Sequence, residues 1–302
     1  MSAPAEDPLG ATTARTGFLC VIAATVLWGT SATLARWTMK QHVPPLTVVE
    51  LRLAISVVIL ALIFALFRPV LFRIGRADIL PLIVLGTVGI AAVQGSYYTN
   101  VSWVGVGLAI LLQYLAPTLV VAYEALVARR APSRLALAAL GCATLGVALL
   151  VLADHGAVAR ANPKGIALGL ASALFFAFYI VYAKRLLARL SPFTVLFYGF
   201  LVAALFWMIF QTPSMIAAAR YGARMWGLFL VIALSSALVP FGLFYAGLAR
   251  LDASRAGIVA LLEPIVAIGS AAWWLGEGLT LSQAMGAALI LLGVGISTRA
   301  DR

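Results

Sequence analysis

Ionisable side chains that fall inside long apolar stretches are the residues of this sequence best placed to hold a solute. The 302-residue chain contains 21 Lys and Arg and 10 Asp and Glu residues. Of these, Glu50, Arg52, Glu124 and Glu263 lie within apolar stretches and are the candidates for a role at membrane depth. A charged group at that depth is stable only when it is paired or faces water. These four residues are therefore the first candidates for binding chemistry.

Glu263 is the candidate closest to the centre of an apolar stretch. It lies about eight residues into a stretch that begins near residue 255, which corresponds to roughly 12 Å at 1.5 Å per residue. Pro264 follows it and removes a backbone hydrogen bond, and Pro117 does the same in the matching stretch of the first half. We expect Glu263 to face a central cavity, either as the partner of an amine or cation or as a proton carrier. The alternative is a permanent pair with Arg52 that braces the helices.

The other three ionisable groups have structural interpretations. Arg52 lies about seven residues into its stretch, and a snorkelling or bracing role is favoured over binding of a substrate carboxylate. Glu50 is expected on a different face from Arg52, because residues two apart on a helix diverge, and to be solvated near the interface. Glu124 is expected to form an interfacial salt bridge with the arginines that follow it.

A second set of candidates combines aromatic and polar side chains inside the apolar stretches. Aromatic rings stack on planar solutes and attract ammonium groups, while their hydroxyls form hydrogen bonds. With Glu263, the predicted substrate-binding residues are Trp28, Ser31, Gln94, Tyr98, Gln113, Tyr114, Tyr179 and Tyr245. Trp and Tyr also collect at membrane interfaces, but this alternative fails for Gln94, Gln113 and Tyr114, which lie well inside their stretches. Tyr98 and Tyr245 are further predicted to act as gates.

The composition predicts that these residues belong to a membrane protein. Hydrophobic residues make up 64% of the chain and charged residues 10%, with a mean hydropathy of +1.07. A soluble domain has about 25% charged residues, so a soluble or secreted enzyme is excluded. Crossing a membrane takes about 20 apolar residues, and ten such segments are present. We place them near residues 17–39, 46–67, 78–99, 104–128, 134–153, 165–187, 193–211, 224–249, 255–276 and 281–298.

Basic residues predict how these segments are oriented. Connections on the side of the N-terminus carry more than twice as many Lys and Arg residues as the opposite connections. Because basic loops stay in the cytoplasm, both termini are predicted to be cytoplasmic in a multi-pass inner (plasma) membrane protein. The net charge of +11 follows from this topology and gives no reason to expect nucleic acid as a partner.

Internal repetition divides the ten segments into two groups of five. Tyr98 and Tyr245 are 147 residues apart, as are Pro117 and Pro264, and Pro44 and Pro192 are 148 apart. The predicted organisation is a cytoplasmic tail (1–16) and two five-helix domains (17–153 and 165–299). Five crossings per repeat turn the second repeat upside down relative to the first, as in many secondary transporters. The predicted fold class is an all-α polytopic membrane protein of two inverted five-helix repeats.

The second half also resembles a known family. It contains Ala-Leu-Leu-Glu-Pro at 260–264, Leu-Gly-Glu at 275–277 and Gly-Ala-Ala-Leu-Ile-Leu-Leu-Gly-Val at 286–294, and in these motifs it resembles the EamA-type domain of the drug/metabolite transporter superfamily. The first half looks like a diverged copy, with Arg129 and Arg130 where the family often has Gly-Glu. The resemblance covers nearly the whole chain and implies a ten-helix carrier of small organic solutes. An aromatic-rich interior is similar to that of amino-acid exporters of the YddG kind.

Together these observations predict a secondary transporter that exports amino acids, aromatic and other neutral ones, or related metabolites by alternating access. Its expected partners are a small-molecule substrate, the lipid bilayer and protons as a candidate coupling ion, with no cofactor, metal or catalytic residue. The alternatives are a multidrug or lipophilic-cation exporter of the same fold, a channel, or a membrane-embedded enzyme. No phosphate-binding Gly-rich motif indicates an ATP-driven pump.

Overall fold

The computed structural model describes residues 8–129, 131–152, 162–275 and 280–299, and within these ranges it contains helices and connections but no strand. The first half contains α1 (Pro8–Lys40), α2 (Pro45–Phe67), the 3₁₀ turn η1 (Pro69–Phe72), α3 (Arg76–Val84), the π-helical turn η2 (Leu85–Ala91), α4 (Ala92–Val104), α5 (Val106–Gln113), α6 (Ala116–Leu126) and α7 (Arg134–Leu152). The second half contains α9 (Pro163–Leu187), α10 (Pro192–Met208), α11 (Pro213–Ala218), α12 (Ala223–Ile232), the π-helical turn η3 (Ala233–Leu238), α13 (Val239–Arg250), α14 (Ala253–Ala260), α15 (Glu263–Leu275) and α16 (Leu281–Arg299).

These elements form ten membrane-crossing units. Among the described residues, nine stretches are long and apolar enough to span a bilayer, and α10 adds a shorter apolar helix. Some crossings consist of several elements in line: α3, η2 and α4 form one, and α12, η3 and α13 form another. The predicted all-α polytopic fold of ten helices is therefore confirmed.

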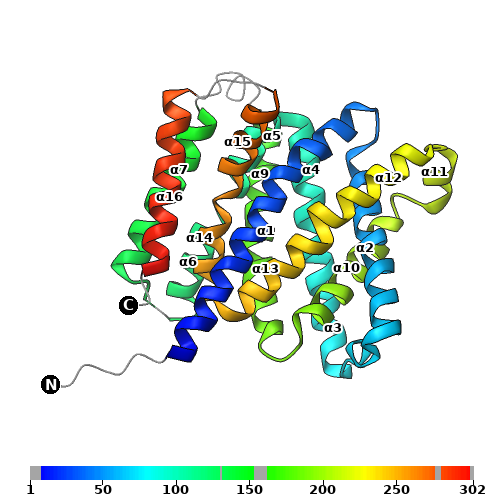
Figure 1. Cartoon of the computed structure of the whole chain (residues 1–302), viewed down its shortest axis with the longest axis horizontal. Helices are drawn as coiled ribbons and strands as arrows, with labels where there is room; N and C mark the ends of the chain where they lie inside the picture. Colours follow the sequence, from blue (N-terminus) through cyan, green and yellow to red (C-terminus); the bar gives the residue numbers. More distant parts are fainter. Residues whose placement is uncertain (1–7, 130, 153–161, 276–279, 300–302) are drawn as a thin grey trace.

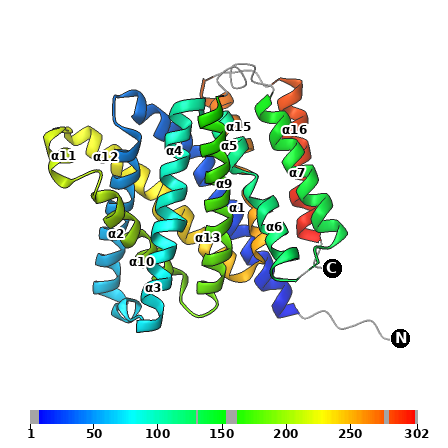
Figure 2. The ribbon, with the colours of Figure 1, turned by 180° about the vertical axis from the view of Figure 1, so that it is seen from behind.

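The two halves run in opposite senses. Figure 1 shows α1 rising from the end of the molecule that carries both termini, whereas α9, the first helix of the second half, descends toward that end (Figure 2). We call this end the N-terminal side. An odd number of crossings per half produces the inversion.

Local sequence signals explain where several helices begin. Asn162 accepts a hydrogen bond from the Gly165 N–H at 2.8 Å, and Ser191 accepts one from the Thr194 N–H at 3.1 Å. Each cap is followed by a proline at the first helical position, where its missing N–H needs no partner. The turn between α4 and α5 uses Gly105, whose φ of 82° favours a residue without Cβ.

The two halves share the same irregularities. The π-helical turns η2 and η3 fall at equivalent positions of the halves, and two helices break at equivalent positions, between α5 and α6 and between α14 and α15. Pro117 and Pro264 each lie in the first turn after the break. Such breaks free backbone carbonyl groups, which are tolerated at membrane depth only where protein or a cavity surrounds them.

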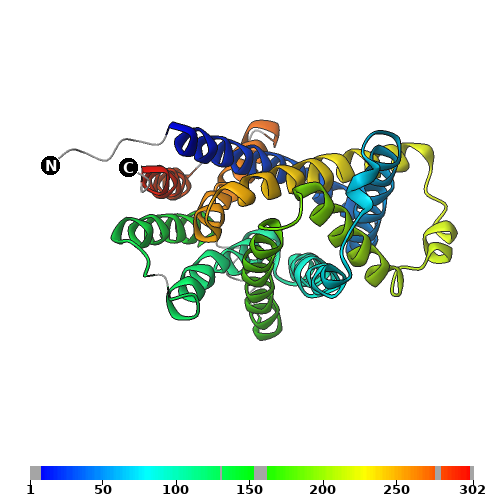
Figure 3. The ribbon, with the colours of Figure 1, turned by 90° about the horizontal axis from the view of Figure 1, so that it is seen from below.

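The last helix of each half packs closely against that of the other. Seen from the N-terminal side, α7 and α16 lie side by side at one end of the bundle (Figure 3). A Cβ atom on Gly146 would lie 2.6 Å from the Gly286 carbonyl oxygen, and one on Gly286 would lie equally close to the Gly146 carbonyl oxygen. Small residues at this contact let the backbones approach, which is how helices associate in lipid. This pair braces the bundle away from the candidate site.

Candidate substrate cavity

A cavity of about 100 Å³ lies between the two halves of the bundle. The predicted residues that line it are Trp28, Ser31, Arg52, Gln94, Tyr98, Gln113, Tyr114 and Glu263. Further lining residues, not predicted as substrate-binding, are Ala35, Met39, Val93, Tyr97, Val101, Phe176, Ser236 and Phe241. Sequence spacing explains why several residues of one helix line the cavity together. The lining residues of α1 recur every three to four positions and therefore share one helix face.

Arg52 on α2 is buried, with 4% of its surface exposed, and neutral groups hold its guanidinium. Its Nη1 donates to the Tyr98 hydroxyl at 2.7 Å and to the Ser236 hydroxyl at 3.3 Å, and its Nη2 donates to Oε1 of Gln94. Gln94 and Tyr98 are four residues apart on α4, so both reach the same group. The Tyr98 ring also lies under the guanidinium, 4.8 Å from centroid to Cζ.

The charge of Arg52 is not neutralised in the cavity wall. Within the described residues no carboxylate lies at ion-pair distance from its guanidinium, and its Nε has no hydrogen-bond partner. A buried cation without an anion is unfavourable unless an anion arrives. Arg52 therefore presents to the cavity a positive charge that has no carboxylate in direct contact.

Glu263 lies at the break between α14 and α15, in the first turn of α15. Its Oε2 accepts a hydrogen bond from the Tyr114 hydroxyl at 2.5 Å, and Tyr114 lies at the matching break between α5 and α6. The two breaks thus bring a carboxylate from one half against a phenol from the other. The N-terminal end of a helix favours a negative charge, whereas enclosure of the carboxyl group within the bundle opposes it.

Arg52 and Glu263 line the same cavity but do not form an ion pair. The alternative of a permanent pair with Arg52 is therefore not found among the described residues, because each side chain is held by hydroxyl or amide groups of its own surroundings. The cavity instead displays two opposite charges on separate walls. Their roles in binding and coupling stay predictions.

Tyr179 and Tyr245, predicted to line the cavity, lie outside its wall. Both rings are almost completely buried, and they stack with centroids 5.9 Å apart and an interplanar angle of 28°. They lie one turn closer than Phe176 and Phe241 to the N-terminal side, at the contact between α9 and α13. The contact between α9 and α13 turns both rings toward each other. Together with Phe241 and Phe244, they form an aromatic layer on the N-terminal side of the cavity.

The cavity extends toward the side opposite the N-terminal side. Its lining includes Met39 on α1 and Val101 on α4, close to the ends of these helices at Lys40 and Val104. Figure 1 shows these ends on the side away from both termini.

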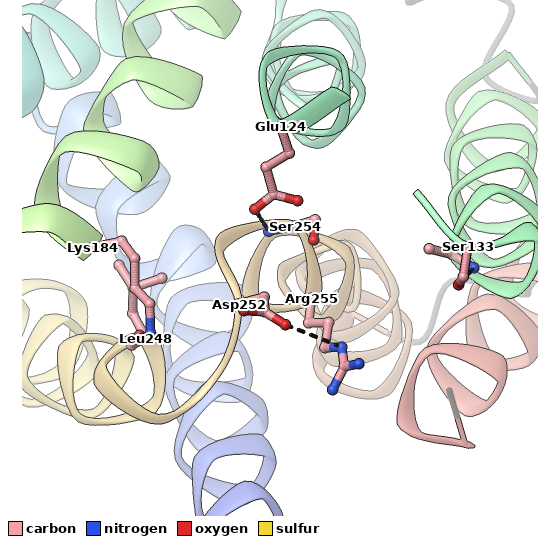
Figure 4. A network of polar contacts seen from close by, with 8 residues as sticks. Glu124, Ser133, Lys184, Leu248, Asp252, Ser254 and Arg255 are labelled. Atoms are coloured by element: carbon pink, nitrogen blue, oxygen red, sulfur yellow. Dashed lines mark hydrogen bonds and ion pairs between the residues drawn. The ribbon is translucent and has the colours of Figure 1, made fainter. Parts of the chain in front are cut away.

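Polar contacts between helices close the N-terminal side (Figure 4). Lys184 on α9 donates to the carbonyl oxygens of Leu248 at 2.9 Å and Ala249 at 3.3 Å, near the end of α13. Glu124 on α6 accepts a hydrogen bond from the Ser254 N–H at 3.3 Å, in the first turn of α14. Among the described residues, Glu124 therefore caps a helix of the other half, and no ion pair joins it to Arg129 or Arg134. Arg130, the third arginine of the expected salt bridge, lies outside the described residues.

Glu50 is also placed differently from the sequence-based expectation. The expectation of a solvated side chain is wrong, since Glu50 is 1% exposed and its Oε2 has no hydrogen-bond partner among the described residues. The start of α2 is covered by an apolar cluster that includes Val48, Leu51 and Phe229. This packing removes the carboxyl group from water.

Ser236 is the most informative residue that sequence reasoning missed. It bonds Arg52 from the π-helical turn η3, whose extra residue changes the phase of the following helix. A serine pair at 235–236 in an apolar run is the only sequence signal for it. Within the described residues, no group of three or more His, Cys, Asp and Glu side chains is arranged to hold a metal ion.

Comparison with known proteins identifies the family. The model of the EamA-like transporter family matches residues 15–152 and again residues 163–299. The chain belongs to the EamA-like transporter family. It is 29% identical over 285 residues to "Uncharacterized inner membrane transporter YicL" of Salmonella typhimurium, covering 93% of this chain and 94% of that protein. It is 30% identical to the threonine/homoserine exporter RhtA of Escherichia coli strain K12, covering 81% and 78%.

A solved structure supports the fold independently. A crystal structure of another protein superposes with a TM-score of 0.76 over 93% of this chain and 96% of that one, at 20% identity. That likeness concerns the fold alone. The family and these relatives establish a multi-pass membrane transporter of small molecules, and the predicted superfamily is confirmed.

Proposed function

We propose that this EamA-family transporter exports small neutral amino acids across the inner membrane by alternating access. The observation that carries the proposal is the pair of separate, opposite charges in one small cavity, Arg52 on one wall and Glu263 on another. An amino acid is a zwitterion whose carboxylate suits the first group and whose ammonium suits the second.

Arg52 is the proposed carboxylate site. Gln94, Tyr98 and Ser236 orient its guanidinium but leave its charge unneutralised. A substrate carboxylate would supply the missing anion and could accept two parallel hydrogen bonds from the planar group. In the bound state Arg52 and the carboxylate would form a buried, charge-assisted pair.

Glu263 is the proposed ammonium site. Tyr114 holds one of its oxygens and leaves the other available to the cavity. Trp28, whose ring packs against Phe241 with centroids 5.0 Å apart, adds an aromatic face that attracts cations. A proton and an ammonium group would compete for the same carboxylate, so inward proton movement would drive outward movement of the amino acid.

The size of the cavity supports a small substrate. Its volume of about 100 Å³ is smaller than the ~300–1,000 Å³ of pockets for drug-sized ligands. The relative RhtA is named for threonine and homoserine, which are solutes of this kind. The multidrug alternative would need a larger cavity than this conformation provides.

The two halves are proposed to exchange conformations during transport. With the N-terminal side in the cytoplasm, as the basic loops predict, the cavity of this structure extends outward and the Tyr179–Tyr245 layer closes the cytoplasmic side. The inverted domains 17–153 and 165–299 would then swap these arrangements. Opening inward requires the contacts of Glu124 and Lys184 with α14 and α13 to break.

Counterflow in proteoliposomes tests the proposal. Vesicles loaded with unlabelled threonine should accumulate radiolabelled threonine, and a lipophilic cation should not compete. Arg52→Gln and Glu263→Gln should each slow accumulation by about 10–100-fold. Arg250→Gln, which changes an exposed arginine outside the cavity, should behave as wild type. Competition by the cation but not by amino acids would favour a multidrug exporter, and unaffected counterflow in both cavity variants would overturn the proposed site.

A further inference from the structure

A second cavity lies between α6 and α9 and has a different character. Its volume is about 430 Å³, and it shares no lining residue with the central cavity. Apolar side chains from both helices form its walls, among them Leu119, Ala122 and Leu126 of α6 and Leu174, Phe178 and Val181 of α9. Leu126 is 80% exposed and Leu174 is 59% exposed, so this groove opens on the outer surface of the bundle.

The length of the groove matches one leaflet of a bilayer. On α9 it extends from Leu174 to Arg185, which is about 16 Å at 1.5 Å per residue. A single leaflet contributes about half of a hydrocarbon core of ~30 Å. Figure 2 shows α9 at the front of the molecule with α6 beside it, and the Arg185 end of α9 points to the N-terminal side. The groove can therefore hold one acyl chain of the leaflet on that side.

A cation stands at the headgroup end of the groove. Arg185 is exposed, donates a hydrogen bond to the Tyr123 hydroxyl across from α6, and lies over the Tyr123 ring, 5.6 Å from the centroid. Among the described residues no carboxylate lies at ion-pair distance from it. Tyr and Arg side chains are typical of the headgroup level of a membrane, and the planar guanidinium matches the oxygens of a phosphate.

We propose that the groove between α6 and α9 is a binding site for an anionic phospholipid, with one acyl chain along the groove and the phosphate on Arg185. The leaflet-length apolar walls and the guanidinium without a carboxylate at one end favour this occupant over a second copy of the chain, because a phospholipid supplies an acyl chain and a phosphate in one molecule. Basic pockets between helices on the cytoplasmic side are typical sites for such headgroups.

Native mass spectrometry of the purified full-length protein tests the site, with dioleoyl-phosphatidylglycerol and dioleoyl-phosphatidylcholine as probes. Arg185→Gln should weaken phosphatidylglycerol binding about tenfold, because one charge-assisted contact is lost. It should weaken phosphatidylcholine binding less, because the choline ammonium offsets the charge of that lipid's phosphate. Arg250→Gln is the matched control, since Arg250 is an exposed arginine near the end of α13 that lies outside the groove. An equal loss of phosphatidylglycerol binding in Arg185→Gln and Arg250→Gln would show that positive charge attracts the lipid without a specific site. That result would overturn the proposal.

Filling the groove provides a second, independent readout. Ala122→Trp from α6 and Val181→Trp from α9 should each reduce binding of both lipids several-fold, whereas Leu205→Trp, on the exposed surface of α10, should not. Size-exclusion chromatography verifies that the variants fold. If one of the two filling variants does not fold, the other still tests the groove. Unchanged lipid binding in both filling variants, or conversion of a dimer to a monomer without loss of lipid, would overturn the proposal.

Discussion

In the first half of the molecule α2 carries Arg52, and at the equivalent position of the second half, 148 residues later, stands Phe200. The situation is reversed at the helix breaks, where the second half carries Glu263 and the equivalent residue of the first half, 147 positions earlier, is Ala116. Phe200 and Ala116 are both completely buried. The backbone breaks and π-helical turns are shared, yet each half supplies one charge that the other lacks. A symmetric scaffold thus supports an asymmetric, dipolar cavity, which suits a substrate with two different charged ends.

The largest predicted effect comes from removing either charge. Arg52→Gln and Glu263→Gln should each lower kcat/KM for a neutral amino acid by about 10–100-fold, the range for loss of one hydrogen-bonded charge. Substrate analogues that lack one charged group distinguish the role of Arg52 from that of Glu263. An amine without the carboxylate should be insensitive to Arg52→Gln, and a hydroxy acid without the ammonium should be insensitive to Glu263→Gln. Equal losses for every analogue would show that the charges brace the fold and bind no substrate.

Tyr114→Phe should have a smaller effect on the same site. It removes the 2.5 Å hydrogen bond to Glu263 but keeps the ring and the carboxylate. We expect KM for an amino acid to rise about tenfold, because the carboxylate loses the partner that orients it, with little change for the hydroxy acid. Tyr97→Phe is the matched control, since Tyr97 lines the cavity without a hydrogen bond to Glu263. A similar rise in both variants would contradict the assigned contact.

Breaking the closed side tests how the halves exchange. Lys184→Met removes two hydrogen bonds to carbonyl oxygens of α13 and should favour opening toward the N-terminal side. The probe is Ser236→Cys in a background where the two native cysteines, Cys20 and Cys142, are changed to alanine. In vesicles of defined orientation, an impermeant maleimide added on the N-terminal side should react with this probe about fivefold faster in the Lys184→Met variant than without it. Arg250→Gln should leave the rate as it was. A lower rate in the Lys184 variant would mean that this contact does not hold the N-terminal side closed.

The smallest effect on transport is expected from the contact between the last helices of the two halves, α7 and α16. Gly146→Ala places a Cβ 2.6 Å from the Gly286 carbonyl oxygen, so α7 and α16 must separate. Stability should fall by ~1–3 kcal/mol, measured as a lower Tm, while KM for the amino acid stays the same. Gly295→Ala on α16 has open space around the added carbon and should leave Tm unchanged. A changed KM in Gly146→Ala would show that this brace takes part in substrate binding.

Much of the cavity wall could be predicted from the sequence because polar residues deep in apolar segments must face protein or water. Gln94, Gln113 and Tyr114 were identified on that ground, and the structure brings them to one cavity. The sequence does not predict that Glu50 is buried or that Tyr179 lies outside the cavity. Their depth in the segment was clear, but the side of the helix that a neighbour would cover was not.

The sequence by itself determined the ten apolar crossings, the duplication and the depth of each polar residue, because these depend on chain position and composition alone. Only the tertiary structure decided that Arg52 binds Gln94, Tyr98 and Ser236, that Tyr114 meets Glu263, and that the two charges stay apart. The physical reason is helix rotation. Lipid is nearly as apolar as the side chains that face it, so hydropathy does not define which face of a helix turns inward, and packing against neighbouring helices settles it.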